Sequence, residues 1–199
     1  MAIKAVFFDI GNVLLGYDWK AAVGRICKQT NVTSEEVGKR FWESGFAKFE
    51  KGFISQAEFF GALAESIEFA GTVGELSLLC SDIFFTLDDN IAVARRLVGR
   101  TELGIISNTN QAHIEFLGPR HDFLEIFKVR VYSHEVHARK PEKEIYDAAL
   151  LQMNARAGES LFVDDLIENV EAARQLGWSA IHLEPQTDLQ KEMKRYDLM

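Results

Sequence analysis

Residues Ile3–Asn12 read IKAVFFDIGN, and this stretch decides how the rest of the chain is interpreted. Its first six residues, Ile3 to Phe8, are mostly apolar and include β-branched and aromatic types. This composition is typical of a strand that is buried on both faces of a parallel sheet. The strand ends at Asp9, and Gly11-Asn12 provides a turn signal. The sequence therefore predicts a central parallel strand with an aspartate at its carboxyl end.

The chain after Asp88-Asp89 alternates between strand and helix patterns. Strands are predicted at 103–106, 128–132, 160–163 and 179–183, and helices at 91–98 and 111–116, from Pro141 onward, and from Leu166 to Gly177. An alternation of this kind predicts a parallel sheet with helices on both faces. The fold class is therefore α/β, a three-layer Rossmann-like sheet.

The segment between the first strand and this alternation has a different pattern. Apolar residues recur there at helical spacing, and two capping boxes, Thr33 to Glu36 and Ser55 to Glu58, indicate helix starts. It contains no convincing strand pattern, and we expect about four helices. The predicted organisation is an α/β core formed by residues 1–16 and 87–199, with a helical bundle of residues 17–86 inserted after the first strand.

Composition excludes several classes of protein. The 199 residues include 22 Lys and Arg against 30 Asp and Glu, a net charge of −8 that argues against a nucleic-acid binder. No window approaches the ~18 apolar residues that a membrane span requires. The two cysteines, Cys27 and Cys80, lack CxxC spacing, so no disulfide framework is expected. We expect a soluble, cytoplasmic protein, a monomer or weak homodimer, with no nucleic-acid or membrane partner.

Polar side chains follow several of the predicted strands. In open α/β sheets, ligands bind outside the carboxyl ends of the strands. The residues that the prediction places there or in the adjoining loops are Asp9, Ser107, Asn108, Thr109, Lys140, Asp164 and Asp165.

These residue types favour one kind of chemistry. Clustered carboxylates repel one another unless they share a cation, and oxygen ligands suit Mg²⁺. A lysine and a hydroxyl suit the oxygens of a phosphoryl group, and an aspartate can act as a nucleophile. The residues alone therefore predict metal-assisted phosphoryl transfer.

Four short motifs in a fixed order carry a family resemblance. They are Phe8 to Val13, Ile106 to Asn110, Arg139 to Glu142, and Phe162 to Asp165 with Asn169 and Ala172-Ala173 downstream. With these motifs the chain resembles the haloacid dehalogenase-like hydrolase superfamily over nearly its whole length. The Asp-x-Gly-Asn-Val and Ser-Asn-Thr-Asn stretches are most similar to those of the α-D-glucose-1-phosphate phosphatase type.

The resemblance implies roles for individual residues. Asp9 would be the nucleophile and a Mg²⁺ ligand, the Gly11 carbonyl would also bind the metal, and Asp164 and Asp165 would complete the metal site, with Asp165 expected as the direct ligand. The resemblance also implies that Ser107 and the Asn108 backbone bind the phosphoryl oxygens. Lys140 would neutralise the charge of the nucleophile and the phosphate. Glu50 would lie in the substrate loop of the helical cap, residues 17–86.

One position departs from the family pattern. Many phosphatases of this family carry a second aspartate two residues after the nucleophile, where it protonates the leaving group. Here that position is Gly11, which has no side chain. The substrate could have a good leaving group, or His113, His134 or Glu50 could supply the proton, or the enzyme could be slow or degenerate. The sequence leaves these alternatives open.

The predicted function is a Mg²⁺-dependent phosphatase that hydrolyses a small phosphomonoester, such as a sugar phosphate, through an aspartyl-phosphate. Three alternatives stay open. A metal-free 2-haloacid dehalogenase would have no use for Asp164 and Asp165, and a phosphomutase would need an acid at position 11. A degenerate protein with a binding or regulatory role is favoured by Gly11 but not by the intact Asp9, Lys140 and Asp164-Asp165.

Overall fold

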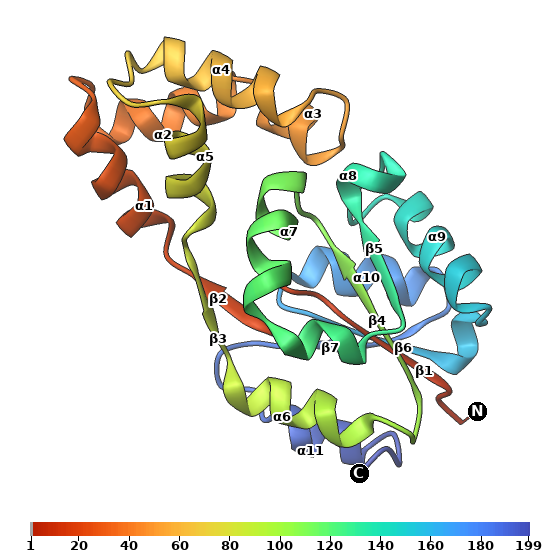
Figure 1. The fold of residues 1–199 in the computed structure, drawn as a ribbon. Coiled ribbons are helices and arrows are strands. Elements are labelled where there is room, and N and C mark those ends of the chain that lie inside the picture. Colours follow the sequence, from red (N-terminus) through yellow and green to blue (C-terminus); the bar gives the residue numbers. More distant parts are fainter. Residues whose placement is uncertain (1) are drawn as a thin grey trace.

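The computed structural model describes residues 2–199 and contains a five-stranded parallel sheet in the order β5-β4-β1-β6-β7 (Figure 1). The strands are β1 (Ala5–Phe8), β4 (Glu102–Ser107), β5 (Val129–Tyr132), β6 (Ser160–Asp164) and β7 (Ser179–His182). The predicted parallel sheet is confirmed, with the first strand at its centre. Because β4 and β6 flank β1, the carboxyl ends of these three strands lie side by side.

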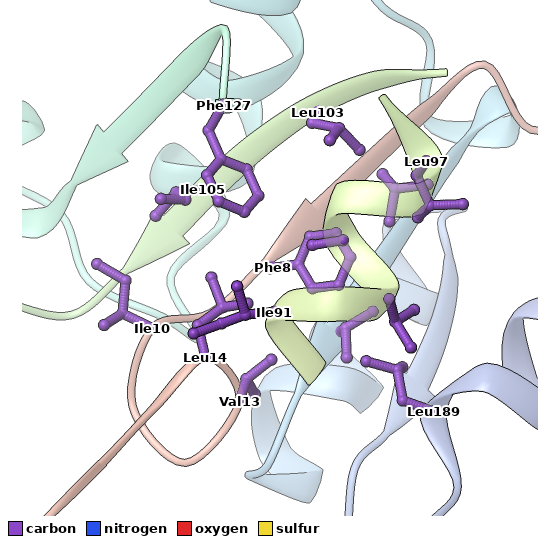
Figure 2. Close-up of a cluster of buried hydrophobic side chains, with 14 of the residues drawn as sticks. Phe8, Ile10, Val13, Leu14, Ile91, Leu97, Leu103, Ile105, Phe127 and Leu189 are labelled. Carbon is purple, nitrogen blue, oxygen red and sulfur yellow. The ribbon is translucent and has the colours of Figure 1, made fainter. Parts of the chain in front are cut away.

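Helices cover both faces of the sheet, so the predicted three-layer arrangement is also confirmed. One face carries α6 (Asp88–Leu97) and α11 (Leu189–Lys194), and the other carries α9 (Lys143–Met153) and α10 (Ile167–Gln175). The alternation of side chains along β1 explains this. Val6 and Phe8 belong to the first apolar cluster, and Ala5 and Phe7 belong to the second. Figure 2 shows Phe8 beneath α6, where its ring packs edge-on against Phe127.

The chain between β1 and α6 forms a separate group of helices. These are α1 (Trp19–Ile26), a short 3₁₀ turn (Cys27–Gln29), α2 (Ser34–Glu43), α3 (Phe46–Glu50), α4 (Gln56–Ser66) and α5 (Val73–Ser81). They enclose an apolar cluster of their own, built around Phe41, Phe49, Phe59 and Leu63. Five α-helices occur where about four were expected, because the short α3 lies between the two capping boxes. In Figure 1 this group lies beyond the carboxyl ends of the strands.

The expectation of no strand between residues 17 and 86 was wrong. Two three-residue strands, β2 (Leu15–Tyr17) and β3 (Phe84–Thr86), pair antiparallel and connect the helical group to the sheet. Each strand is too short to show a period of two, and its partner lies about 70 residues away in the chain. The assignment of residues 17–86 to a distinct cap stays a prediction.

Some local predictions need adjustment. Helix α9 begins at Lys143 and not at Pro141, with Glu142 as its first flanking residue. The helices α8 (Ser133–Val136) and α11 were not anticipated, whereas α7 (Gln111–Leu117) and the end of α10 before Gly177 agree with the sequence. Within residues 2–199, no helix combines the length and apolar character needed to cross a bilayer.

Candidate active site

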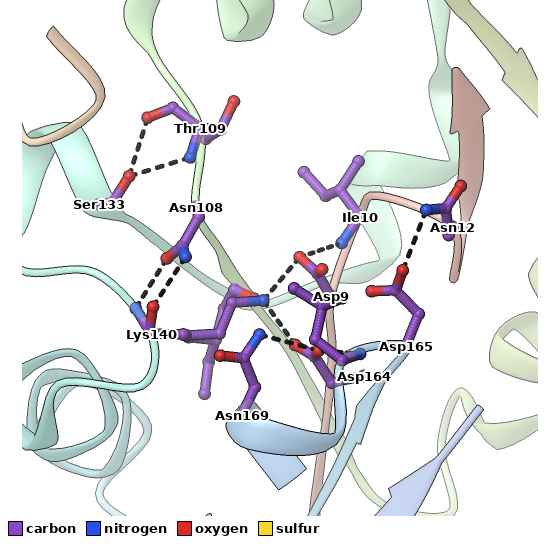
Figure 3. A network of polar contacts seen from close by, with 12 residues as sticks. Asp9, Ile10, Asn12, Asn108, Thr109, Ser133, Lys140, Asp164, Asp165 and Asn169 are labelled. Atoms are coloured by element: carbon purple, nitrogen blue, oxygen red, sulfur yellow. Dashed lines mark hydrogen bonds and ion pairs between the residues drawn. The ribbon is translucent and has the colours of Figure 1, made fainter. Parts of the chain in front are cut away.

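The side chains predicted to form the site come from neighbouring strand ends. Asp9 directly follows β1, Ser107 ends β4 and Asp164 ends β6, so the three residues lie at one edge of the sheet. Figure 3 shows Asp9 and Asp164 close together. All three are buried. Parallel strands in the order β4-β1-β6 bring together residues that are up to 155 positions apart in the chain.

Lys140 links two of these strand ends. Its Nζ lies 2.8 Å from Asp9 Oδ1 and 2.7 Å from Asp164 Oδ2, and it donates a 3.0 Å hydrogen bond to the Ile106 carbonyl. The residue is only 2% exposed, so its ammonium group is almost wholly removed from water. A buried cation is tolerated when charged partners surround it, as the two carboxylates do here.

Asn108 holds the loop that carries this lysine. Its side-chain amide donates to the Lys140 carbonyl at 3.0 Å and accepts from the Lys140 N–H at 2.7 Å (Figure 3). The reciprocal pair fixes the backbone of Lys140 relative to the end of β4. Asn108 thereby has a structural task in addition to the phosphate contact that the sequence predicts for its backbone.

Both oxygens of the Asp164 carboxylate accept hydrogen bonds from protein donors. Oδ1 accepts from the Leu166 N–H and from Asn169 Nδ2, both at 2.9 Å, and Oδ2 accepts from Lys140. The residue has no exposed surface. Through these hydrogen bonds, Asp164 orients the Lys140 side chain and the start of α10.

Asp165 is less enclosed and faces the loop after β1. Its Oδ2 accepts a 2.9 Å hydrogen bond from Asn12 Nδ2, and its backbone carbonyl lies 3.0 Å from His182 Nε2. Asn12 was expected as a turn residue and as part of the first motif, with no contact to the site carboxylates. The Asn12 amide, three positions after Asp9, is the signal that could have assigned it to the site.

The three carboxylates can hold a cation. One oxygen from each of Asp9, Asp164 and Asp165 can be chosen so that all three lie within 4.8 Å of one another. Three carboxylates against the single Lys140 ammonium leave two negative charges, which a divalent ion balances. Asp9 and Asp165 each keep one oxygen without a hydrogen-bond partner in residues 2–199. Hard oxygen ligands in this number suit Mg²⁺.

The electrostatics of the site follow from burial and charge crowding. Burial raises the pKa of Asp9 to about 7 although Lys140 opposes the rise, and the carboxylates of Asp164 and Asp165 add to it. Burial alone would lower the pKa of Lys140, but Asp9 and Asp164 outweigh it and the pKa is raised. The pKa of Asp165 is raised as well, chiefly by burial. A cation at this position would relieve the repulsion among the carboxylates, which contributes to the raised pKa values of Asp9 and Asp165.

The loop after β4 provides the groups expected to meet phosphate oxygens. Ser107 is 3% exposed and its hydroxyl makes no hydrogen bond to the described residues. Thr109 is tied down by Ser133, whose hydroxyl accepts from the Thr109 N–H and lies 2.9 Å from the Thr109 carbonyl. Ser133 was not expected near the site. Its position directly after a predicted strand was the available signal.

Glu50 lies where the helical group meets the sheet region. Its carboxylate is 3.2 Å from Arg139, next to Lys140 in the chain, and its carbonyl accepts a 2.6 Å hydrogen bond from Ser133. Burial raises the pKa of Glu50, and the Arg139 guanidinium partly offsets this. Lys51 forms a second link, 2.6 Å from Glu142. The structure thus places Glu50 beside the loop of Lys140, in contact with Arg139 and with none of the strand-end carboxylates.

The two histidines considered as proton donors face protein partners. His113 Nε2 lies 3.3 Å from the Cys80 carbonyl of α5, and burial lowers the pKa of His113 to about 4. His134 Nδ1 lies 3.2 Å from the Thr109 carbonyl, and burial lowers its pKa too. Both rings therefore tend to be uncharged near neutral pH.

The side of the site that carries Asp165 opens onto a wide groove. Its volume is about 1340 Å³, and its walls come from β3, α6 and the segment between β7 and α11. Asp165 and Asn12 line it, and so do four further carboxylates, those of Asp88, Asp89, Glu184 and Asp188, against the single guanidinium of Arg96. Such a lining attracts cations and repels phosphate.

A Rossmann-like sheet that gathers a buried lysine and three carboxylates at its strand ends is the arrangement of an enzyme active site. The model of the haloacid dehalogenase-like hydrolase family matches residues 3–177, and the chain belongs to this family. The superfamily resemblance drawn from the four motifs is confirmed. The narrower resemblance to glucose-1-phosphate phosphatases stays a prediction.

Similar proteins span most of the chain. A sesquiterpene phosphatase of Aspergillus oryzae is 27% identical over 90% of this chain and 89% of its own length. A D-ribitol-5-phosphate phosphatase of Bacteroides thetaiotaomicron is 25% identical over 96% of this chain and 97% of its own. A haloacid dehalogenase family enzyme of the same bacterium, solved with magnesium and inorganic phosphate, has a TM-score of 0.84 at 21% identity, covering 96% of this chain and 99% of that one.

Proposed function

We propose that this protein is a Mg²⁺-dependent phosphatase that hydrolyses a small phosphomonoester through an aspartyl-phosphate. The observation that carries the proposal is the cluster of Asp9, Asp164 and Asp165, whose oxygens lie within 4.8 Å of one another beside the buried Lys140. A cluster with this excess negative charge is stable around a cation, and a phosphate ester can then approach Asp9.

Asp9 is the proposed nucleophile. Its Oδ1 is held by the Ile10 N–H at 2.7 Å and by Lys140, which fixes the direction in which the carboxylate points. One carboxylate oxygen attacks phosphorus, the bond from phosphorus to the ester oxygen breaks, and the alcohol leaves. Water then attacks the same phosphorus, the acyl phosphate bond breaks, and free Asp9 returns with inorganic phosphate.

The remaining residues bind and orient. Ser107 and the Asn108 N–H are the proposed donors to the phosphoryl oxygens, and Lys140 offsets charge on both the nucleophile and the phosphate. When bound, Mg²⁺ supplies positive charge that stabilises the phosphoryl oxygens and keeps Asp9 ionised. Asp9, Asp165 and the Gly11 carbonyl are its proposed direct ligands. Asp164 has its oxygens occupied by Lys140, Leu166 and Asn169, so it supports the site from behind.

Residues 17–86 are the proposed cap over the substrate. The acidic groove on the side that carries Asp165 is unfavourable to phosphate, so the substrate would enter between the helical group and the sheet. Two curated relatives are phosphatases by name, one acting on a sesquiterpene and one on a polyol phosphate. Glu50, next to Arg139, is proposed to contact the part of the substrate that lies beyond the phosphate.

The metal-free dehalogenase remains the alternative from a different class of reaction. Displacement of halide by an aspartate requires no cation, whereas this site gathers two further carboxylates beside Asp9. Without a cation, the single ammonium group of Lys140 would have to balance the repulsion among these three carboxylates. The same cluster argues against a degenerate protein, because Lys140 contacts both Asp9 and Asp164 and the three carboxylates lie close together.

The test is phosphate release from a panel of sugar, polyol and prenyl phosphates and p-nitrophenyl phosphate, with Mg²⁺ and after treatment with a chelator. We expect activity that requires Mg²⁺ and falls by on the order of 10³-fold or more in Asp9→Asn. Asp122→Asn, a change at an exposed surface carboxylate, is the matched control and should retain activity. Turnover of no phosphate, full activity in Asp9→Asn, or halide release by metal-free protein would each overturn the proposal.

A further inference from the structure

The leaving oxygen of an alkyl phosphate must gain a proton when its bond to phosphorus breaks, and position 11 has no side chain to supply it. His113, His134 and Glu50 each turn a polar atom toward a protein partner, as described above. None of these three residues lies beside Gly11. A residue that supplies this proton in place of an acid at position 11 would have to reach the space beside Gly11.

Tyr17 occupies the space beside Gly11. A Cβ atom built on Gly11 would lie 3.7 Å from Tyr17 Cε1, and, chain neighbours aside, no other heavy atom of the described residues lies within 4 Å of it. Cε1 is bonded to the ring carbon that carries the hydroxyl. The polar end of Tyr17 thus lies in the region that a side chain at position 11 would enter.

The pairing of β2 with β3 turns Tyr17 toward the site. Tyr17 is directly opposite Phe84, and opposite residues of an antiparallel pair project on the same face. The Phe84 ring packs edge-on against His113, with centroids 5.0 Å apart, in the first turn of α7. That helix directly follows the loop of Ser107 and Asn108. Phe85 lies on the other face of the two-stranded ribbon formed by β2 and β3, where its ring packs over Gly16.

The Tyr17 hydroxyl is free to meet a substrate. The residue is 48% exposed, and its hydroxyl makes no hydrogen bond to residues 2–199. A phenol O–H can donate a hydrogen bond or a proton to a substrate oxygen. Position 17 also lies in the ribbon that leads to the helical group, so the proton donor and the proposed cap are connected.

We propose that Tyr17 replaces the missing acid at position 11, an inference that rests on the proposed phosphatase function. As the bond from phosphorus to the ester oxygen breaks, the phenol O–H proton moves to that oxygen, and a neutral alcohol leaves. The resulting phenolate takes a proton from the water that attacks the aspartyl-phosphate. The phenol is restored at the end of the cycle, and no further reactant is needed.

The experiment compares Tyr17→Phe with the parent protein on two phosphates of similar shape. Benzyl phosphate releases an alkoxide that needs a proton, whereas p-nitrophenyl phosphate releases a stable phenolate that does not. We expect kcat for benzyl phosphate to fall by roughly 10²–10⁴-fold and kcat for p-nitrophenyl phosphate by less than about tenfold. A merely structural role for Tyr17 would lower both to the same extent.

A rescue variant makes the comparison sharper. The 3.7 Å separation is ordinary van der Waals contact, so Gly11→Asp should fit, and adding it to Tyr17→Phe should restore at least tenfold of the lost benzyl phosphate activity. Phe85→Leu, which changes the other face of the ribbon, should leave the ratio of the two activities unchanged.

Equal losses on both substrates, no loss, or a parent protein that turns over p-nitrophenyl phosphate but not benzyl phosphate would overturn the role of Tyr17 alone. A parent protein that hydrolyses no phosphate would overturn the phosphatase function and this role together.

Discussion

Two regions of the molecule specify their helices in different ways: the inserted segment, residues 17–86, and the sheet region, which is the rest of the described chain. In the inserted segment, α1, α2, α4 and α5 each begin with a side-chain cap, provided by Asp18, Thr33, Ser55 and Thr72. The three longest helices of the sheet region, α6, α9 and α10, begin without one. Short-range signals thus define the inserted helices, whereas packing against the sheet defines the others.

The two regions also differ in what they bury. The interior of the inserted segment is apolar and rich in aromatic rings, with Phe49 stacked on Phe59 at 4.6 Å. The sheet region buries Asp9, Lys140 and Asp164 at its strand ends. Burying charge is costly unless every group is paired. The sheet region therefore holds most of the buried charge, and the inserted segment adds the carboxylate of Glu50, which is paired with Arg139.

The largest expected effect tests the polar interior of the sheet region. Asp164→Ala would leave Asn169 Nδ2 and the Leu166 N–H without their acceptor, and it would remove one of the two carboxylates that contact Lys140. We expect the free energy of unfolding to fall by about 3–5 kcal/mol, together with loss of phosphatase activity. Urea denaturation measures the first and phosphate release the second. Asp122→Ala, which removes an exposed partner of Arg95, should change neither, and equal effects of the two substitutions would refute the contrast.

The next effect concerns the contact between the two regions. His113 of α7 faces the Cys80 carbonyl of α5, and burial lowers the pKa of its imidazole from 6.5 to about 4. Between these values the unfolded chain binds more protons than the folded one, so His113 destabilises the fold as the pH falls. We expect a contribution of about 2 kcal/mol between pH 7 and pH 5.

The measurement is the difference between the parent protein and His113→Gln, in which glutamine can still donate to the Cys80 carbonyl. The raised pKa of Asp9 acts in the opposite direction, favouring the fold as the pH falls, and it cancels in this difference. Chemical denaturation at both pH values should show that the parent loses more stability than the variant. Parallel pH profiles would show that this contact between the regions carries no pH dependence.

The smallest effect tests the local signals of the inserted segment. Thr72→Ala removes the capping box that Thr72 forms with Glu75 at the start of α5. We expect a loss of about 1 kcal/mol, seen as faster amide exchange in the first turn of α5 with little change in β1 or β6. A substitution to alanine at Glu142, which precedes α9 without a side-chain cap, should leave the first turn of α9 unchanged. Faster exchange throughout the sheet after Thr72→Ala would mean that the two regions unfold together.

Much of the site could be predicted because it depends on strand ends. The apolar run before Asp9 and the alternation after Asp89 indicate parallel strands, and parallel strands align their carboxyl ends. Asp9, Ser107 and Asp164 were therefore expected together, and the structure brings them together. Lys140 was identified by its loop and motif. Its position between two carboxylates also depends on the two hydrogen bonds between the Asn108 side chain and the Lys140 backbone.

Other features could not be predicted, because they arise between segments with no common pattern. The ribbon of β2 and β3 joins two three-residue strands about 70 positions apart. The contact between Asn12 and Asp165 spans 153 positions. Short-range patterns carry no information about such pairs, since each partner alone fits an ordinary turn or loop.

The amino-acid sequence is enough to predict the class of the fold, the order of the motifs and the residue types able to bind a cation and phosphate. Hydrophobic periodicity and turn chemistry act over a few residues, and these properties are local. The tertiary structure sets three further outcomes: Asp164 is enclosed while Asp165 is partly exposed, Glu50 meets Arg139, and Tyr17 lies beside Gly11. Those outcomes depend on how separate segments pack, because distance in space, unlike distance along the chain, sets the strength of charge and hydrogen-bond interactions.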